Sequence, residues 1–181
     1  MMKQLNHWQQ LTICCALCER SMPNYELFCE LEDKADNALA ARKILNKVWE
    51  FVRGQLNSLK NIEKQSLLLP DLMPSDEESF GALAAMDTII ALQSCIQSIL
   101  DDSILEAENI ESLLHDRLTQ MLELQGEDPA QNPLATRHEQ FIQICHQAVS
   151  QQKPHAEVIK TLIPLSKDDG VSHLGISLEQ E

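Results

Sequence analysis

Three cysteines near the N-terminus are the first residues in this sequence whose spacing could support metal chemistry. Cys15 and Cys18 form a CxxC pair, and Cys14 directly precedes it. Structural zinc sites usually combine two such pairs, whereas this chain has no second CxxC and no HxxxH. Cysteine is also one of the most frequently buried side chains. We therefore interpret these cysteines as packing residues of a helix, and we predict no metal ligands and no cofactor.

A single aspartate in an apolar segment is the second candidate for chemistry. Asp87 is the only charged residue between Phe80 and Leu100. A charge on a mostly apolar helix is costly unless a partner neutralises it. We therefore predict that Asp87 forms a buried ion pair with Arg20 or Arg42, and we favour this structural role over a catalytic one.

Polar residues also follow the cysteines in the segment Leu17–Cys29, which reads LCERSMPNYELFC. Pro23 is expected to end the first helix and to start a second one, so that a corner forms here. We group the polar side chains of this corner with Asp87 as a candidate cluster that is either structural or ligand-binding, and we assign none of them as catalytic. The cluster consists of Glu19, Arg20, Asn24, Tyr25 and Asp87.

The sequence contains no GxSxG, Walker A or dinucleotide-binding glycine motif, and its five glycines are too few to build a phosphate cradle. The six histidines are scattered. His138 shares an apolar face with Phe141 and Cys145, and we interpret it as a hydrogen-bonded core histidine. His115 is expected to face outward. An enzymatic function would therefore depend on carboxylates within helices.

Charge and composition exclude several classes of partner. The chain has 28 acidic and 14 basic residues, with a net charge of −14 and no visible cluster of Lys and Arg. This balance disfavours direct binding to nucleic acid or to an anionic membrane. The apolar stretch at residues 11–18 is too short for a signal sequence, and no stretch approaches the roughly 20 apolar residues of a membrane span. We expect a cytoplasmic protein with reduced thiols.

Leu, Ala, Gln and Glu are abundant, and apolar residues recur at steps of three and four, so the pattern predicts an all-α fold. We predict one domain over residues 1–181, a bundle of about six or seven helices around a central apolar helix. This helix is expected to run from about Asp76 to Asp101, and its part at residues 80–100 forms the centre of the bundle. Residues 60–79 are expected to form an ordered loop, with or without a helical turn, that ends in a capping box at Ser75. The other helices are expected at about 3–20, 23–32, 36–56, 104–125, 133–149 and 154–165.

Single residues predict where several helices end or begin. Gly126 is expected to end its helix in a left-handed conformation, and Asn132 with Pro133 to begin the next. Pro164 is expected to break the last helix. The tail from Gly170 alternates apolar and polar residues in part, which is compatible with either a docked extended segment or a loose one.

The Leu17–Cys29 segment resembles a signature of the YjaG-like bacterial family, domain-of-unknown-function family 416. The matching motifs in this corner are Leu17-Cys18-Glu19-Arg20, Pro23-Asn24-Tyr25 and Phe28-Cys29. Further similar segments are Ile44-Leu45 with Trp49-Glu50, Ala85-Met86-Asp87 with Ala91-Leu92, Asn132-Pro133 and Leu174-Gly175-Ile176. The resemblance covers nearly the whole chain. It implies a compact, all-helical cytoplasmic protein and no known reaction.

The leading functional hypothesis is a non-enzymatic interaction or regulatory protein that self-associates, because the chain lacks chemical motifs and has extensive apolar helix faces. The alternative is an enzyme or small-ligand-binding protein whose site lies between the Leu17–Cys29 corner and the Asp87 helix. That alternative requires the polar cluster to converge on a water-accessible cavity. A weaker third possibility is an acidic mimic of nucleic acid, which would require the acidic side chains to share one face.

Overall fold

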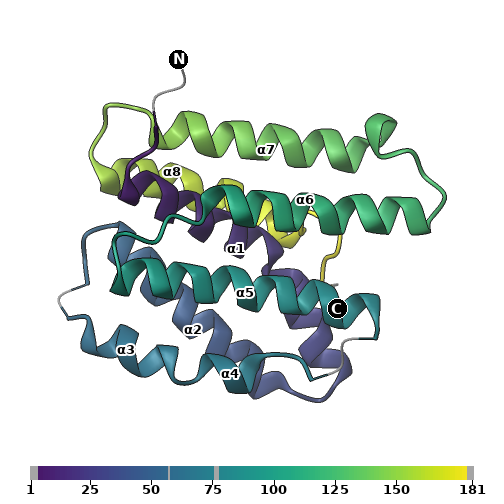
Figure 1. Ribbon diagram of the computed structural model, residues 1–181, viewed down its shortest axis with the longest axis horizontal. Helices are drawn as coiled ribbons and strands as arrows, with labels where there is room; N and C mark the ends of the chain where they lie inside the picture. Colours follow the sequence, from purple (N-terminus) through teal and green to yellow (C-terminus); the bar gives the residue numbers. More distant parts are fainter. Residues whose placement is uncertain (1–3, 57, 76–77, 179–181) are drawn as a thin grey trace.

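The computed structural model describes residues 4–56, 58–75 and 78–178, and this part of the chain forms a bundle of helices (Figure 1). The predicted all-α fold is confirmed. The helices are α1 (His7–Leu31), α2 (Ala35–Val52), α3 (Lys60–Ser66), α4 (Leu69–Leu72), α5 (Phe80–Leu100), α6 (Ala107–Leu124), α7 (Pro133–Val149) and α8 (His155–Lys167), with the short 3-10 helices η1 (Pro129–Gln131) and η2 (Asp168–Gly170).

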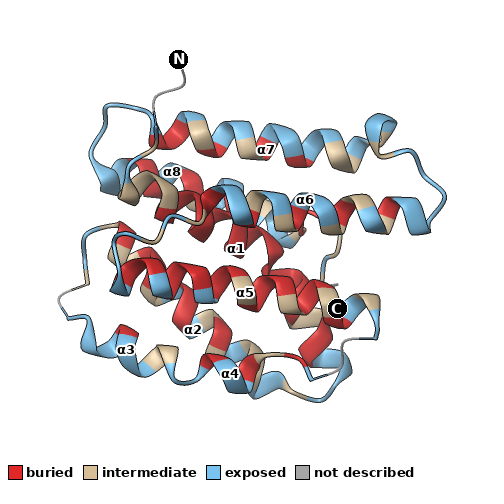
Figure 2. Cartoon of the chain, in the orientation of Figure 1, coloured by how far each residue is buried: buried red, intermediate tan, exposed pale blue. Residues whose placement is uncertain are grey.

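Helices α1 and α5 form the centre of the bundle and run antiparallel. Every residue of α1 from Leu11 to Tyr25 is buried, and most of α5 is buried as well (Figure 2). The Thr88 hydroxyl of α5 donates a hydrogen bond to the Ser21 carbonyl of α1 at 3.0 Å. The prediction that no stretch approaches a membrane span is wrong, because α5 has the length and apolar composition that a span would need among the described helices. However, 67% of that stretch is buried inside the bundle. This burial is that of a core helix.

The predicted corner at Pro23 is wrong, because α1 continues through Pro23 to Leu31. A proline inside a helix loses one backbone hydrogen bond and costs roughly 3 kcal/mol. Here the surrounding segment is buried on all sides, and the burial of its apolar side chains outweighs that local cost. The same error occurred at Pro164, since α8 runs through it to Lys167.

Other boundaries differ in smaller ways. The segment expected to be a loop contains the short helices α3 and α4. Helix α5 begins at Phe80, where the Ser79 side chain accepts a hydrogen bond from the Ala82 amide at 3.1 Å, so Ser75 is not the cap. The predicted first residues of that helix, at 76–77, lie outside the described residues. Two predictions are confirmed: Gly126 has φ +75°, and Asn132 caps α7.

The C-terminal segment 171–178, here called the strap, is docked against the bundle. Its Val171 and Ser177 form an antiparallel bridge, and the Ser172 amide donates a hydrogen bond to the Ile176 carbonyl at 2.8 Å. Leu174 is buried in a small apolar cluster with residues of three helices, namely Ala84, Leu118, Leu122 and Leu134. The strap thereby closes one end of the core.

Candidate functional site

The six cysteines are free thiols in the interior of the protein. Burial raises the pKa of the Cys14 thiol to about 12, and it also raises the pKa of Cys15 and Cys18 well above the ordinary value of a thiol. Only the thiolate is a good nucleophile or metal ligand. Within the described residues, no three His, Cys, Asp or Glu side chains are grouped so that they could hold a metal ion. The cysteines therefore contribute packing volume to α1, α5 and α7.

The five residues of the candidate cluster lie in separate environments. Glu19 is on the side of α1 that faces α2, and its side chain is fully buried. Its carboxylate accepts two hydrogen bonds from Arg42 Nη1, at 2.7 and 2.8 Å. Arg42 also reaches Glu26 at 3.3 Å, and Lys167 Nζ lies 3.9 Å from Glu19. Glu19 is thus neutralised by cations from α2 and α8.

Arg20 is the next residue of α1, and it points toward α7 and the end of α8. Its guanidinium lies 4.5 Å from the centre of the Phe141 ring and donates to the Leu165 carbonyl at 3.2 Å. It forms an ion pair with Asp168 at 3.1 Å, and Arg137 pairs with the same carboxylate. Burial lowers the pKa of Arg20. Arg20 consequently ties α1 to the turn that precedes the strap.

Asp87 does not meet either arginine that we predicted for it. Arg117 of α6 binds it through two hydrogen bonds, from Nε at 2.7 Å and from Nη2 at 3.2 Å. Burial raises the pKa of Asp87, while the Arg117 guanidinium acts in the opposite direction. The sequence contained one signal for Arg117: it lies beside Leu114 and Leu118, at the edge of the buried stripe of α6. Which carboxylate it would meet depended on how the helices pack.

The remaining two members of the cluster, Tyr25 and Asn24, are also buried, and they do not share a site with the other three. The Tyr25 hydroxyl donates to the Leu72 carbonyl of α4 at 2.7 Å, and burial raises the pKa of Tyr25. Asn24 is buried, and its side-chain amide has no hydrogen-bond partner among the described residues. The cluster therefore breaks up into the Glu19–Arg42 pair, the Arg20–Asp168 pair, the Asp87–Arg117 pair and two residues that contact other parts of the core.

Two buried histidines lie near Arg20, and one of them was not singled out from the sequence. His138 is buried as predicted, but neither of its ring nitrogens has a hydrogen-bond partner within the described chain. His173 of the strap is in the same situation, and the two rings are 5.2 Å apart. Burial, followed by the charge of Arg20, lowers the pKa of His138 to about 4. Burial, followed by His138 and then Arg20, lowers the pKa of His173 well below its ordinary value. Both rings are therefore neutral near pH 7.

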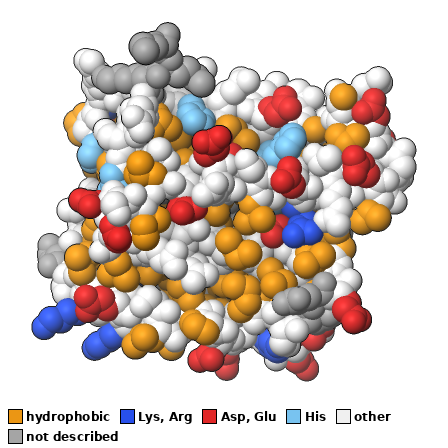
Figure 3. Space-filling view, viewed as in Figure 1, with side chains coloured by type: hydrophobic (Ala, Val, Ile, Leu, Met, Phe, Trp, Pro, Cys, Tyr) orange, Lys and Arg blue, Asp and Glu red, His pale blue; other side chains and the backbone are white. Residues whose placement is uncertain are grey.

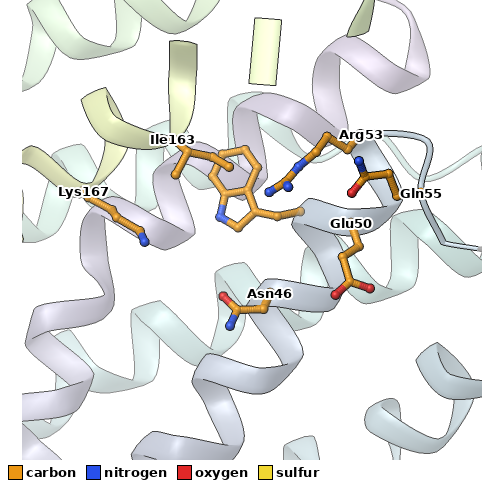
Figure 4. Close-up of a pocket in the computed structure, with 7 residues that line it drawn as sticks. Asn46, Glu50, Arg53, Gln55, Ile163 and Lys167 are labelled. Atoms are coloured by element: carbon orange, nitrogen blue, oxygen red, sulfur yellow. The ribbon is translucent and has the colours of Figure 1, made fainter. Parts of the chain in front are cut away.

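Two hollows on the surface are relevant to ligand binding. The first, of about 670 Å³, is lined by Glu19, Pro23, Glu26, Arg42, Lys167 and residues of the strap and its preceding turn. The second, of about 440 Å³, lies between α2 and α8 (Figure 4). It is lined by Asn46, Trp49, Glu50, Arg53, Gln55, Ile163 and Lys167. One signal for the second hollow is present in the sequence, since Asn46, Trp49 and Arg53 recur at helical spacing along α2 and the residue that follows it.

Comparison with known proteins gives relatives without an assigned activity. The chain is 29% identical to an uncharacterized protein of Haemophilus influenzae over 190 aligned positions, which cover 99% of this chain and 96% of the relative. It is 28% identical to the uncharacterized protein YjaG of Escherichia coli, with coverage of 99% and 95%.

A crystal structure of a DUF416 family protein from Shewanella baltica has the same fold. The TM-score is 0.79 at 24% sequence identity, with 96% of this chain and 95% of the other covered. The family model described as "Protein of unknown function (DUF416)" matches residues 1–177. This match covers nearly the whole chain, and the protein therefore belongs to the DUF416 family.

Proposed function

We propose that this protein is a non-enzymatic, cytoplasmic interaction protein that self-associates through the outward side of α5. The observation that carries this proposal is a line of six uncharged residues on the surface of the central helix. They are half-buried or exposed, whereas every other residue of α5 after Gly81 is buried, and they are Leu83, Met86, Ile90, Gln93, Gln97 and Leu100. We call this line the α5 seam.

The spacing of the α5 seam is that of a helix–helix contact. Its members follow one another at steps of three and four, as the a and d positions of a heptad do. Hydrophobic side chains form a band across this face of the molecule, over α5 and the neighbouring α3 and α4 (Figure 3). On a chain with a net charge of −14, an uncharged band is the surface on which two copies repel each other least.

A second copy is the partner that fits the seam best, because the seam is complementary to itself in antiparallel order. If two copies pair around a twofold axis between residues 91 and 92, Leu83 meets Leu100 of the other copy at both ends. Met86 then meets Gln97, and Ile90 meets Gln93. A twofold contact of this kind uses the same patch on both subunits. The paired stretch would be about 27 Å long.

The proposal is tested by measuring the molar mass in solution by light scattering at micromolar concentration. We expect a dimer, and we expect added salt to strengthen it, because salt screens the repulsion between two acidic subunits. Ile90→Glu should place two charges in the contact and raise the dissociation constant at least about tenfold. Leu124→Glu is the matched control, because Leu124 is 72% exposed at the end of α6, off the seam. A monomeric wild-type protein, or equal effects of the two variants, would disprove the proposal.

The antiparallel register gives an independent test with spin labels. Cysteines introduced at Gln93 should give a short distance between the two copies, whereas cysteines at Leu83 should give a distance longer by about 20 Å. The native cysteines should resist labelling, because they are buried and burial raises the pKa of those in α1. Two short distances would indicate parallel pairing and would contradict the register.

The alternative site between the Leu17–Cys29 segment and the Asp87 helix has weaker support. Glu19 and Asp87 each have their own arginine, and only Glu19 borders the first hollow. Arg20 is turned to a third set of partners. These residues stabilise the packing of different helices against α1 and α5, which favours the interaction protein over an enzyme.

A further inference from the structure

The hollow between α2 and α8, here called the Trp49 hollow, contains hydrogen-bond donors without partners. Trp49 is 3% exposed, and its indole Nε1 has no hydrogen-bond partner within the described chain. The Nε of Arg53 is likewise buried and unpartnered. An unmade hydrogen bond of a buried donor costs about 1–3 kcal/mol. Two such donors in the lining of one hollow indicate that an acceptor belongs there.

The charges of the Trp49 hollow favour a negatively charged acceptor. Arg53 forms no ion pair with any described residue. The Lys167 side chain is 56% exposed, and its Nζ is 3.9 Å from the Glu19 carboxylate. Arg42 already binds that carboxylate at 2.7 Å, so the charge of Lys167 is only weakly neutralised. The one acidic residue of the lining, Glu50, is paired with Lys47 at 3.1 Å. The lining therefore contains two positive side chains and one negative side chain. This local excess of positive charge contrasts with the net charge of −14 of the whole protein.

The positions of these groups suit one small molecule. Figure 4 shows that Arg53 and Lys167 extend into the hollow from opposite sides, from α2 and from the end of α8, with Ile163 above. The hollow measures about 440 Å³, which is within the range of small-ligand sites. Ile163 offers apolar contact area, and Asn46 and Gln55 add amide groups to the lining.

We propose that the Trp49 hollow binds a small organic anion. Its carboxylate or phosphate group would accept hydrogen bonds from Arg53, Lys167 and the Trp49 indole N–H. Its apolar or aromatic part would lie against Ile163. A guanidinium presents its donors in a planar fork that matches both kinds of head group. This site is separate from the α5 seam and does not depend on self-association.

The test uses the indole N–H signal of Trp49 in a proton–nitrogen correlation spectrum of the full-length protein. The chain has two tryptophans, and Trp8→Phe assigns their two signals. The Trp8 indole already donates to the Val52 carbonyl at 2.8 Å and serves as an internal reference. The probes are benzoate, phenyl phosphate and the neutral isostere benzamide. Benzoate and phenyl phosphate distinguish a carboxylate site from a phosphate site.

We expect at least one of the two anions to shift the Trp49 signal in a saturable manner while the Trp8 signal stays in place. Benzamide should bind about tenfold more weakly or worse. Arg53→Gln should weaken anion binding about tenfold or more, and Lys167→Gln should weaken it less, because the lysine is more exposed. Lys160→Gln is the matched control, since it removes the same charge from an exposed position of α8 outside the lining.

Three results would overturn the proposal. One is the absence of any shift of the Trp49 signal with both anions at about 10 mM, the range of very weak binding. Another is benzamide binding as tightly as benzoate. The third is equal binding by Arg53→Gln and by Lys160→Gln, both checked for a native fold by circular dichroism.

Discussion

Glu19 and Arg20 are adjacent in the sequence, yet they face two different sides of α1 with different kinds of polar packing. On the Glu19 side, every charged group has a charged partner, in the set Glu19, Glu26, Arg42 and Lys167. On the Arg20 side, only Arg20, Arg137 and Asp168 are paired. Nearby His138 and His173 are buried, uncharged and without hydrogen-bond partners among the described residues.

The difference shows two ways of keeping polar groups inside a helical bundle. The Glu19 side retains its charges, because cations from two other helices offset the loss of hydration. The Arg20 side keeps its imidazoles neutral instead, because burial and the neighbouring Arg20 disfavour protonation. The first arrangement should be sensitive to the removal of a partner, and the second should be sensitive to pH.

The largest expected effect is on the Glu19 side. Arg42→Met should lower the free energy of unfolding by about 3 kcal/mol, because it leaves the buried Glu19 carboxylate with only the distant Lys167. The value is at the low end for buried pairs, since the adjoining hollow can admit water. Urea unfolding at neutral pH measures it. Lys47→Ala, which breaks a half-buried surface pair on the same helix, should cost less than about 0.5 kcal/mol. Equal losses in both variants would contradict the buried role of Glu19.

The second effect is the pH response of the Arg20 side. The folded pKa of His138 is about 4 and its ordinary value is 6.5, so the unfolded chain binds more protons in between. The stabilising contribution is complete above about pH 6.5 and is lost as the pH falls toward 4. Between about pH 7 and pH 5 the free energy of unfolding should fall by about 2 kcal/mol from His138 alone. The groups that face the imidazoles are Arg20 and His115, besides the other imidazole.

The matched comparison is the double variant His138→Gln with His173→Gln. Its free energy of unfolding should depend on pH clearly less than that of the wild type over the same interval. An unchanged slope would mean that carboxylates elsewhere cause the pH dependence, and the contrast between the two sides of α1 would then be lost.

The smallest expected effect distinguishes the two cations near Glu19, the exposed Lys167 and the more buried Arg42. Lys167→Gln should change the free energy of unfolding by less than about 1 kcal/mol, because Lys167 is 56% exposed and 3.9 Å from Glu19. A thermal melt suffices to detect it. A loss as large as that of Arg42→Met would show that Lys167 is as important as Arg42 for the buried carboxylate.

The sequence by itself determined the class of fold and much of the core. Apolar residues at helical spacing predicted the helices, because that periodicity requires one side of each helix to be covered. Local signals were reliable where the backbone alone sets the conformation, as at Gly126 and Asn132. The motif of Leu17–Cys29 resembled the family that the comparisons then showed.

Only the tertiary structure decided what the buried polar residues contact. The sequence placed Glu19, Arg20 and Asp87 in one cluster. Adjacent residues of a helix point about 100° apart, so Glu19 and Arg20 face different neighbouring helices, and the packing of those helices gives each residue a separate partner. The continuation of α1 through Pro23 has the same origin, since the energy of burying a long segment exceeds a local preference. Ion-pair partners come from residues far apart in the chain, and their choice depends on helix positions that no local pattern records.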